Sequence, residues 1–426
     1  MRIRARSPLV TLVAAVALFA IAAAAPGAAK AAPWCGTIAT EDRSAAVTGR
    51  QIHVIYAIPS DGEDRSAQFA PQISGWVDEI TAWWQAQDSG RVPRFDLAVF
   101  PCGLQVDLTV LRLQASSVAL APIGDRFDQI ANEVVSAGGG SPYTKYLVFF
   151  DGPSEEPDLC GQGGGSPDEV GVAVVYERAC DGVPKQATAA HELIHAFGAL
   201  PQGDVPHRCP DSPGHPCDSE SDILYPFAGG NPLGTLVLDS GRDDYYGHSG
   251  SWFDVQDSGW LRRLGPVFRL SLAIAGPGNV TSLVPGVDCT TSCETDWEAG
   301  SIVDLEATPD PGQRLIRWTG ACSGTGECSV PLDAAKSVGA VFAKLAYRLT
   351  VSVKGRGSVA IGSSGFVPCR SRCSSSQTSY RTLALKAKAD KGWKLVRWTG
   401  VCRGKAAVCR VPMSADTSVG AVFSRR

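Results

Sequence analysis

The sequence predicts an α+β domain built on a mixed sheet, followed by two small all-β domains. Three observations predict this organisation. The first half of the 426-residue chain mixes segments with strand-like and helix-like patterns. The second half contains two copies of one module. Within each copy, apolar residues alternate with polar or small ones, which is the period of a half-buried strand.

The N-terminus has the three-part pattern of a secretory signal peptide. Three arginines precede an uncharged apolar run over residues 8–25, and Ala-Lys-Ala at 29–31 offers small residues for cleavage. We therefore expect residues 1–31 to be removed and the mature protein to be secreted, without a membrane span. Fourteen cysteines, an even number, fit an oxidising compartment where disulfides persist, and Cys35 is expected to pair with Cys102.

The first half of the mature chain is expected to contain four strands and three helices. The helix over residues 66–87 is amphipathic, because its apolar residues recur at helical spacing. The glycine-rich segment 161–169 is expected to be a flexible loop near the cleft. The expected strands are 50–59, 95–101, 145–152 and 171–177, and the other expected helices are 127–138 and 187–198.

The helix expected over residues 187–198 carries the sequence His-Glu-x-x-His. His191 and His195 are four residues apart, so on a helix they share one face with Cβ atoms about 6 Å apart, and both imidazoles can bind one ion. Glu192 follows the first histidine and can accept a proton from a water held by that ion. The alternative is a helix that carries two histidines by coincidence.

This motif resembles that of the metzincins, in which His-Glu-x-x-His-x-x-Gly-x-x-His precedes a methionine turn. The resemblance includes Gly198 and then ends, because Pro201 stands where the third histidine belongs and proline cannot bind a metal. It implies an α+β zincin (metzincin-like) catalytic domain over residues 32–265, with a mixed sheet and an active-site helix. It also implies bound Zn²⁺ and hydrolysis of peptide bonds in a protein or peptide substrate.

Three different residues that follow Gly198 in the chain are candidates for the third ligand. His207 has the usual metzincin ligand type and precedes Cys209, which could pair with Cys217 and hold the loop. The motif then resembles a longer-spaced variant seen in secreted actinobacterial metalloproteases, so we predict zinc ligation by His191, His195 and His207. Asp204 and His215 are the alternatives.

Residues 221–227, SDILYPF, resemble the methionine turn, with Leu224 at the methionine position. In the family this residue forms an apolar floor under the metal, so leucine is a tolerable replacement. Tyr225 is a candidate to supply a hydroxyl to the transition state, and the alternative is a packed core tyrosine. Residues 238–261 could line a cleft or hold calcium, but they lack an Asp-x-Asp-x-Asp-Gly pattern, and we expect a surface turn there.

The second half repeats with a shift of about 80 residues. LIRWTGACSG at 315–324 corresponds to LVRWTGVCRG at 395–404, and SVGAVF occurs at 337 and 418. Four cysteines recur in the same way, and pairing of Cys289 with Cys293 and of Cys322 with Cys328 closes the shortest loops, although pairing between the ends of a module is equally allowed. Domains of about 80 residues have marginal cores that cross-links stabilise. The expected boundaries are 266–346 and 347–426.

Both copies resemble divergent internalin-type B repeats of secreted bacterial proteins, through the glycine-rich first hairpin, the paired cysteines and the Trp-x-Gly-x-Cys stretch. Their charges differ strongly, because residues 348–426 carry a net charge of +14 and residues 269–347 a net charge of −4. The resemblance implies spacing, adhesion or wall association.

The sequence leaves two functions open. The first is a secreted, monomeric zinc endopeptidase with Glu192 as general base. The alternative is an adhesive protein with a degenerate protease domain, whose basic second repeat binds an anionic cell-wall polymer or another polyanion. Glu192 favours the first, since a degenerate enzyme commonly loses its general base. The basic repeat could also dock on the acidic first half of the chain.

Overall fold

The computed structural model describes residues 34–43, 46–121, 124–156, 158–200, 205–226, 230–361, 368–378 and 382–426. The expected signal peptide, residues 1–31, lies outside these ranges. The described part contains an N-terminal α/β domain with three helices and a mixed sheet, and C-terminal all-β modules. No helix in the described ranges combines the length and the apolar character needed to cross a bilayer.

The central sheet of the N-terminal domain has the strand order β5-β1-β6-β8-β7. The first four strands pair in parallel, and β7 pairs antiparallel with β8 at one edge. This arrangement confirms the expected mixed sheet. The strands are β1 (Gln51–Ile58), β5 (Leu108–Arg112), β6 (Thr144–Phe150), β7 (Gly161–Gly165) and β8 (Gly171–Tyr176).

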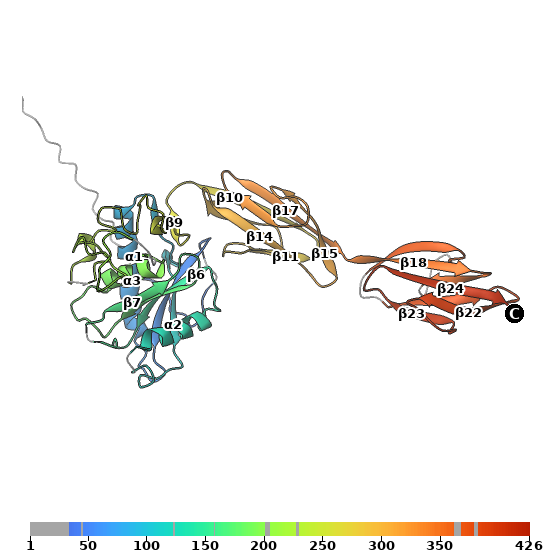
Figure 1. The fold of residues 1–426 in the computed structure, drawn as a ribbon, viewed down its shortest axis with the longest axis horizontal. Helices are drawn as coiled ribbons and strands as arrows, with labels where there is room; N and C mark the ends of the chain where they lie inside the picture. Colours follow the sequence, from blue (N-terminus) through green and yellow to red (C-terminus); the bar gives the residue numbers. More distant parts are fainter. Residues whose placement is uncertain are drawn as a thin grey trace, which may run out of the picture. The chain divides into compact units, whose positions relative to one another are not determined.

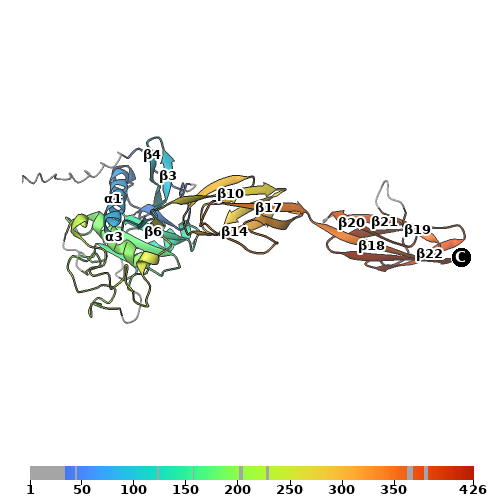
Figure 2. The same ribbon diagram turned by 90° about the horizontal axis from the view of Figure 1, so that it is seen from above.

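Helices cover both faces of this sheet, which explains why β1, β6 and β8 are almost entirely apolar. Alternate side chains such as Val54 and Phe149 pack against α1 (Ser66–Gln87) and α3 (Lys185–Ala196), which lie on the same face (Figure 2). Their neighbours along the strands, such as Val148, pack against α2 (Arg126–Ala137) on the other face (Figure 1).

Smaller elements complete the N-terminal domain. β3 (Leu97–Phe100) and β4 (Gly103–Val106) form a hairpin, and β2 (Arg91–Pro93) pairs with β9 (Leu261–Arg263). Two short 3₁₀ helices, η1 (Leu233–Thr235) and η2 (Val255–Asp257), lie in the long segment after α3.

The first C-terminal module contains two four-stranded sheets that share one core. Its first strand and its last strand pair in parallel, so the ends of the module close its main sheet. The sheets are β13-β10-β17-β15 and β12-β11-β14-β16. The strands are β10 (Val267–Ala275), β11 (Gly278–Ser282), β12 (Asp288–Cys289), β13 (Cys293–Glu298), β14 (Ile302–Pro309), β15 (Gln313–Gly320), β16 (Cys328–Pro331) and β17 (Lys336–Lys344).

The second module repeats this plan with sheets β20-β18-β24-β22 and β19-β21-β23. The same strand irregularity follows Leu315 in the first module and Leu395 in the second, which confirms the internal repeat. The strands are β18 (Ala346–Lys354), β19 (Gly357–Ile361), β20 (Arg372–Thr378), β21 (Thr382–Ala389), β22 (Trp393–Gly400), β23 (Val408–Pro412) and β24 (Thr417–Arg425).

All fourteen cysteines lie in the described ranges and form seven disulfides. The expected pairings within each module are present, as are the expected bonds Cys35–Cys102 and Cys209–Cys217. Cross-links of this number persist in oxidising compartments, which indicates an extracellular protein.

The prediction of a flexible loop over residues 161–169 was wrong, because residues 161–165 form the edge strand β7. Its glycines allow α3 to approach the strand backbone. A Cβ atom on Gly163 would lie 2.3 Å from the backbone oxygen of Glu192, and one on Gly165 would lie 2.4 Å from that of Ala196. The glycine run therefore reflects close packing of helix on strand.

We expect Gly163→Ala to destabilise the N-terminal domain by about 1–3 kcal/mol, because the added methyl group overlaps the backbone of α3. The shift of the urea midpoint measures this effect. Gly164→Ala in the same strand is the control, since its Cβ would meet only ring atoms of Phe127 at 3.9 Å. Equal midpoints for the two variants would contradict the packing argument.

Candidate metal centre

Helix α3 places two of the expected ligands. Pro184 precedes the helix, and residues such as Leu193 and Ile194 bury its inner face against the sheet. His191 and His195 lie one turn apart, with ring centroids separated by 4.9 Å. Their Nε2 atoms are 3.2 Å apart.

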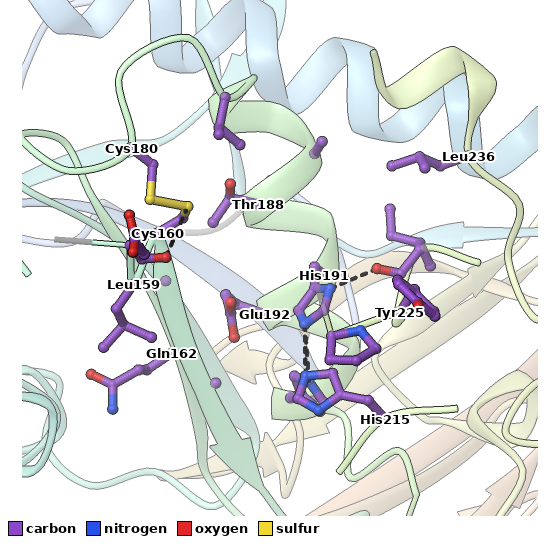
Figure 3. A pocket seen from close by; sticks show the side chains of 18 of the residues that line it. Leu159, Cys160, Gln162, Cys180, Thr188, His191, Glu192, His215, Tyr225 and Leu236 are labelled. Carbon is purple, nitrogen blue, oxygen red and sulfur yellow. Dashed lines mark hydrogen bonds between the residues drawn. A yellow bond between two sulfur atoms is a disulfide. The ribbon is translucent and has the colours of Figure 1, made fainter. Parts of the chain in front are cut away.

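His215 brings a third imidazole to this pair. Its Nε2 atom lies 3.2 Å from Nε2 of His191 (Figure 3). The same atom lies 3.3 Å from Nε2 of His195. The three nitrogen atoms therefore form a nearly equilateral triangle. This triad could hold a metal ion.

A short loop closed by the Cys209–Cys217 disulfide presents His215 to the helix. The stem of the loop is antiparallel: the Cys209 N–H donates to the His215 carbonyl and the Cys217 N–H donates to the His207 carbonyl, both at 2.8 Å. Within the loop, Ser212 Oγ lies 2.7 Å from Nδ1 of His215. The ring therefore has a partner on the side away from the triad.

The structure does not bring His207, the predicted third ligand, into the triad. His207 has a left-handed backbone (φ 52°), and its Nδ1 atom lies 3.3 Å from Oδ2 of Asp244. His207 precedes the disulfide-closed loop, and its carbonyl accepts from the Cys217 N–H at the base of that loop. The alternative Asp204 lies outside the described residues.

The turn that carries Leu224 contacts the triad directly. Nδ1 of His191 donates to the carbonyl oxygen of Ile223 at 2.6 Å, which leaves its Nε2 unprotonated in the neutral ring. Leu224 is fully buried. Asp222 holds the turn, since its Oδ1 accepts from the Leu224 N–H and from the Tyr245 hydroxyl, both at 2.8 Å.

Burial favours the neutral form of all three imidazoles, which is the form that binds metals. Burial, and then repulsion from a protonated His215, lower the pKa of His191 to about 4. Burial and the other two imidazoles hold the pKa of His195 well below its usual value, and burial lowers that of His215. A cation between the rings would satisfy lone pairs that otherwise face one another.

Glu192 lies beside the triad and is only 7% exposed. Burial raises the pKa of its carboxyl group to about 8. Edge strand β7 borders this side chain, because a Cβ on Gly161 would lie 2.6 Å from Cγ of Glu192. Figure 3 shows Glu192 between the strand and His191.

All of these groups open into one cavity of about 810 Å³. Its wall includes the triad, Glu192, Tyr225, and Gly161 to Gly163 of β7. Sequence reasoning missed Ser212, the Ile223 carbonyl and β7. The expected pairing of Cys209 with Cys217 was the one available signal for Ser212, because Ser212 and the imidazole that it contacts, His215, both lie between these cysteines.

Comparison with known proteins bears mainly on the C-terminal modules. Residues 279–346 and 347–426 each match the family model of the divergent InlB B-repeat domain. The second half of the chain therefore carries two such repeats. No curated protein matches this chain.

Several solved structures resemble parts of the chain at low identity. The TIE protein of Bacillus anthracis is 9% identical, with a TM-score of 0.24, over 38% of this chain and 34% of that one. OgpA from Akkermansia muciniphila is 10% identical, with a TM-score of 0.27, over 91% of this chain and 97% of that one. A catalytically inactive OgpA in complex with an O-glycopeptide substrate is 9% identical, with a TM-score of 0.26, over 91% and 98% of the two chains.

If the triad holds a metal ion, we expect Ser212→Ala to weaken its affinity for Zn²⁺, used as the probe ion, about 10- to 100-fold, because the hydrogen bond that orients His215 is lost. Competition with a chromophoric chelator measures the affinity. Ser219→Ala is the control, since the Ser219 hydroxyl contacts that of Ser221 instead of a histidine. An unchanged affinity in Ser212→Ala would show that this contact does not position the ring.

Proposed function

We propose that the protein is a secreted zinc-dependent endopeptidase with a metzincin-like catalytic domain over residues 32–265. The observation that carries the proposal is the triangle of Nε2 atoms with Glu192 in the same cavity. We further propose His191, His195 and His215 as the zinc ligands, with His215 in place of His207. The seven disulfides support an extracellular location.

The dimensions of the triangle support zinc. Nitrogen ligands about 2.05 Å from a tetrahedral ion lie roughly 3.3 Å from one another. The observed separations are 3.2, 3.2 and 3.3 Å. Three protein ligands leave one of four positions open to water or substrate, as catalytic zinc sites require.

Zinc, when bound, supplies a Lewis acid that lowers the pKa of a water molecule toward neutrality and polarises a carbonyl group. Glu192 is placed to take a proton from the attacking water and to pass it to the leaving amine. The buried position of Glu192 limits the access of bulk water to its carboxyl group. A nearby cation favours the charged form of this group. Tyr225, on the wall of the same cavity, is our candidate for a hydroxyl that contacts the transition state.

The edge strand supports an extended peptide as substrate. β7 ends the sheet, and its residues Gly161 to Gly163 line the cavity beside Glu192. An extended peptide can add to such an edge through main-chain hydrogen bonds. This mode places a backbone carbonyl, the group that a peptidase attacks, alongside the triad.

Variants of single residues test the proposal in the full chain. We expect His215→Ala to lose one equivalent of zinc and the hydrolysis of casein. Glu192→Gln should keep the zinc and lose at least about 10²-fold in activity, because the proton acceptor is gone. Mass spectrometry of the metal and casein hydrolysis are measured on the same samples.

His248→Ala provides the histidine control, since His248 stacks on Trp252 and lies outside the triad. This variant should match the wild type in both readouts. Retention of zinc and activity in His215→Ala would overturn the ligand assignment. Full activity in Glu192→Gln would refute its role as general base.

Polyanion binding by the second repeat is a second candidate function, and one observation favours it. Lys386 and Lys388 on β21 lie on the same outer face as Arg410 on β23, because the register pairs Ala384 with Arg410 and Lys386 with Val408. All three are exposed. The corresponding positions of the first repeat hold Glu306, Thr308 and Ser329. The same fold therefore presents a basic face in one module only.

Exchange of these residues for their first-repeat counterparts, Lys386→Glu with Lys388→Thr and Arg410→Ser, tests this face. We expect weaker binding of the full chain to duplex DNA, used as a generic polyanion. The negative slope of the logarithm of the association constant against the logarithm of the salt concentration should become shallower by about three. The control removes two exposed charges from the first repeat, Arg314→Ser with Arg317→Ser. This variant should keep both the affinity for DNA and the salt dependence of the wild type. Equal losses in the two variants would contradict a specific basic face.

A further inference from the structure

A second group of metal-binding side chains lies at the base of the loop that carries His215. It consists of His207, Asp218, Asp243 and Asp244, here called the stem cluster. One ligand atom from each residue lies within 4.8 Å of the others. Nδ1 of His207 is 3.3 Å from Oδ2 of Asp244 and 3.9 Å from Oδ2 of Asp243.

The buried carboxylate of Asp244 is the independent sign that a ligand belongs there. Its side chain is 0% exposed, and its Oδ1 atom has no hydrogen-bond partner among the described residues. A buried carboxylate oxygen without a donor carries a high desolvation cost. The Asp244 carboxylate also belongs to the converging group, so a positive charge in the cluster would offset this cost.

Protonation of His207 alone does not meet this need. The imidazolium ion would bring one positive charge to three carboxylates, and its Nδ1–H already points at Oδ2 of Asp244. Oδ1 of Asp244 would stay without a partner. A divalent cation supplies more charge and can contact several oxygen atoms at once.

We propose that the stem cluster binds a second divalent metal ion, separate from the ion of the histidine triad. The donor set indicates zinc, because four ligands that include an imidazole fit its preferred coordination. Calcium prefers six to eight oxygen atoms, and the cluster offers three carboxylates and a nitrogen.

The position of the cluster gives the ion a structural role. His207 and Asp218 flank the disulfide-closed loop, one on each stem, and Asp243 and Asp244 come from the segment that Asp239 organises. Oδ2 of Asp239 accepts hydrogen bonds from the backbone of Asp244, Tyr245 and Tyr246. An ion at the cluster would tie both stems to that segment and so restrain the loop that presents His215.

Metal counting on the full chain tests the proposal. After dialysis against excess Zn²⁺, the wild type should hold two equivalents of zinc, measured by mass spectrometry. The double variant Asp218→Asn with Asp243→Asn should hold one equivalent of zinc. The double variant His191→Ala with His195→Ala should also hold one equivalent. The variant with all four changes should hold none. Asp211→Asn, an exposed carboxylate of the same loop outside the cluster, should hold two.

The two metal sites can fail independently. The wild type could instead hold a single equivalent of zinc. If the double variant His191→Ala with His195→Ala loses it and the double variant Asp218→Asn with Asp243→Asn keeps it, the stem site is overturned and the proposed peptidase site stays intact. One equivalent with the opposite pattern would support the stem site and overturn the triad as the metal centre.

Thermal unfolding gives a second readout that does not depend on activity. In the His191→Ala with His195→Ala background, added Zn²⁺ should raise the Tm, since a ligand that binds only the folded state stabilises it. Further change of Asp218 and Asp243 to asparagine should abolish this rise. A rise with Ca²⁺ and none with Zn²⁺ would overturn the assignment of zinc to the cluster.

Discussion

The convergence of three half-buried imidazoles is the constraint around which the N-terminal domain is organised. Burial favours the neutral form of the rings, and their three Nε2 atoms face one another at 3.2 to 3.3 Å. Separate parts of the chain must cooperate to hold this arrangement. Helix α3 supplies two rings, the Cys209–Cys217 loop supplies the third, and the Ile223 carbonyl fixes the tautomer of His191. A cation between the rings turns an unfavourable contact into a favourable one.

Close approach of α3 to β7 completes the site, and glycine makes it possible. Any side chain on Gly161 or Gly163 would overlap Glu192, so the glutamate is held between a bare strand and the first histidine. The same bare strand leaves its edge open beside the triad. Packing of the helix and access of a peptide therefore depend on the same glycine residues, which joins the stability of the domain to the shape of the cavity.

Local patterns in the sequence predicted the helix with its two histidines and several strands of the sheet, because each depends on residues close together in the chain. Internal sequence identity predicted the two repeats, and the resemblance to metzincins predicted the mixed sheet. The proposed role of His215 depends on how the Cys209–Cys217 loop folds against α3, whereas the resemblance to a longer-spaced motif favoured His207. β7 has no apolar alternation, since its glycines are required by close contact with helix α3, whose contacting residues include Glu192 and Ala196. Both features depend on tertiary contacts that a local pattern does not contain.

The two repeats share their core structure and differ in net charge, so comparing them shows which features the fold requires. Trp318 and Trp398 donate to the corresponding carbonyl groups of Gly326 and Ala406, and both cores bury most of their equivalent apolar residues. The first repeat builds this structure with a net charge of −4, whereas residues 348–426 carry +14. Basic residues are therefore not needed for folding, and their mutual repulsion opposes it. A charge that the fold does not require points to a partner outside the module.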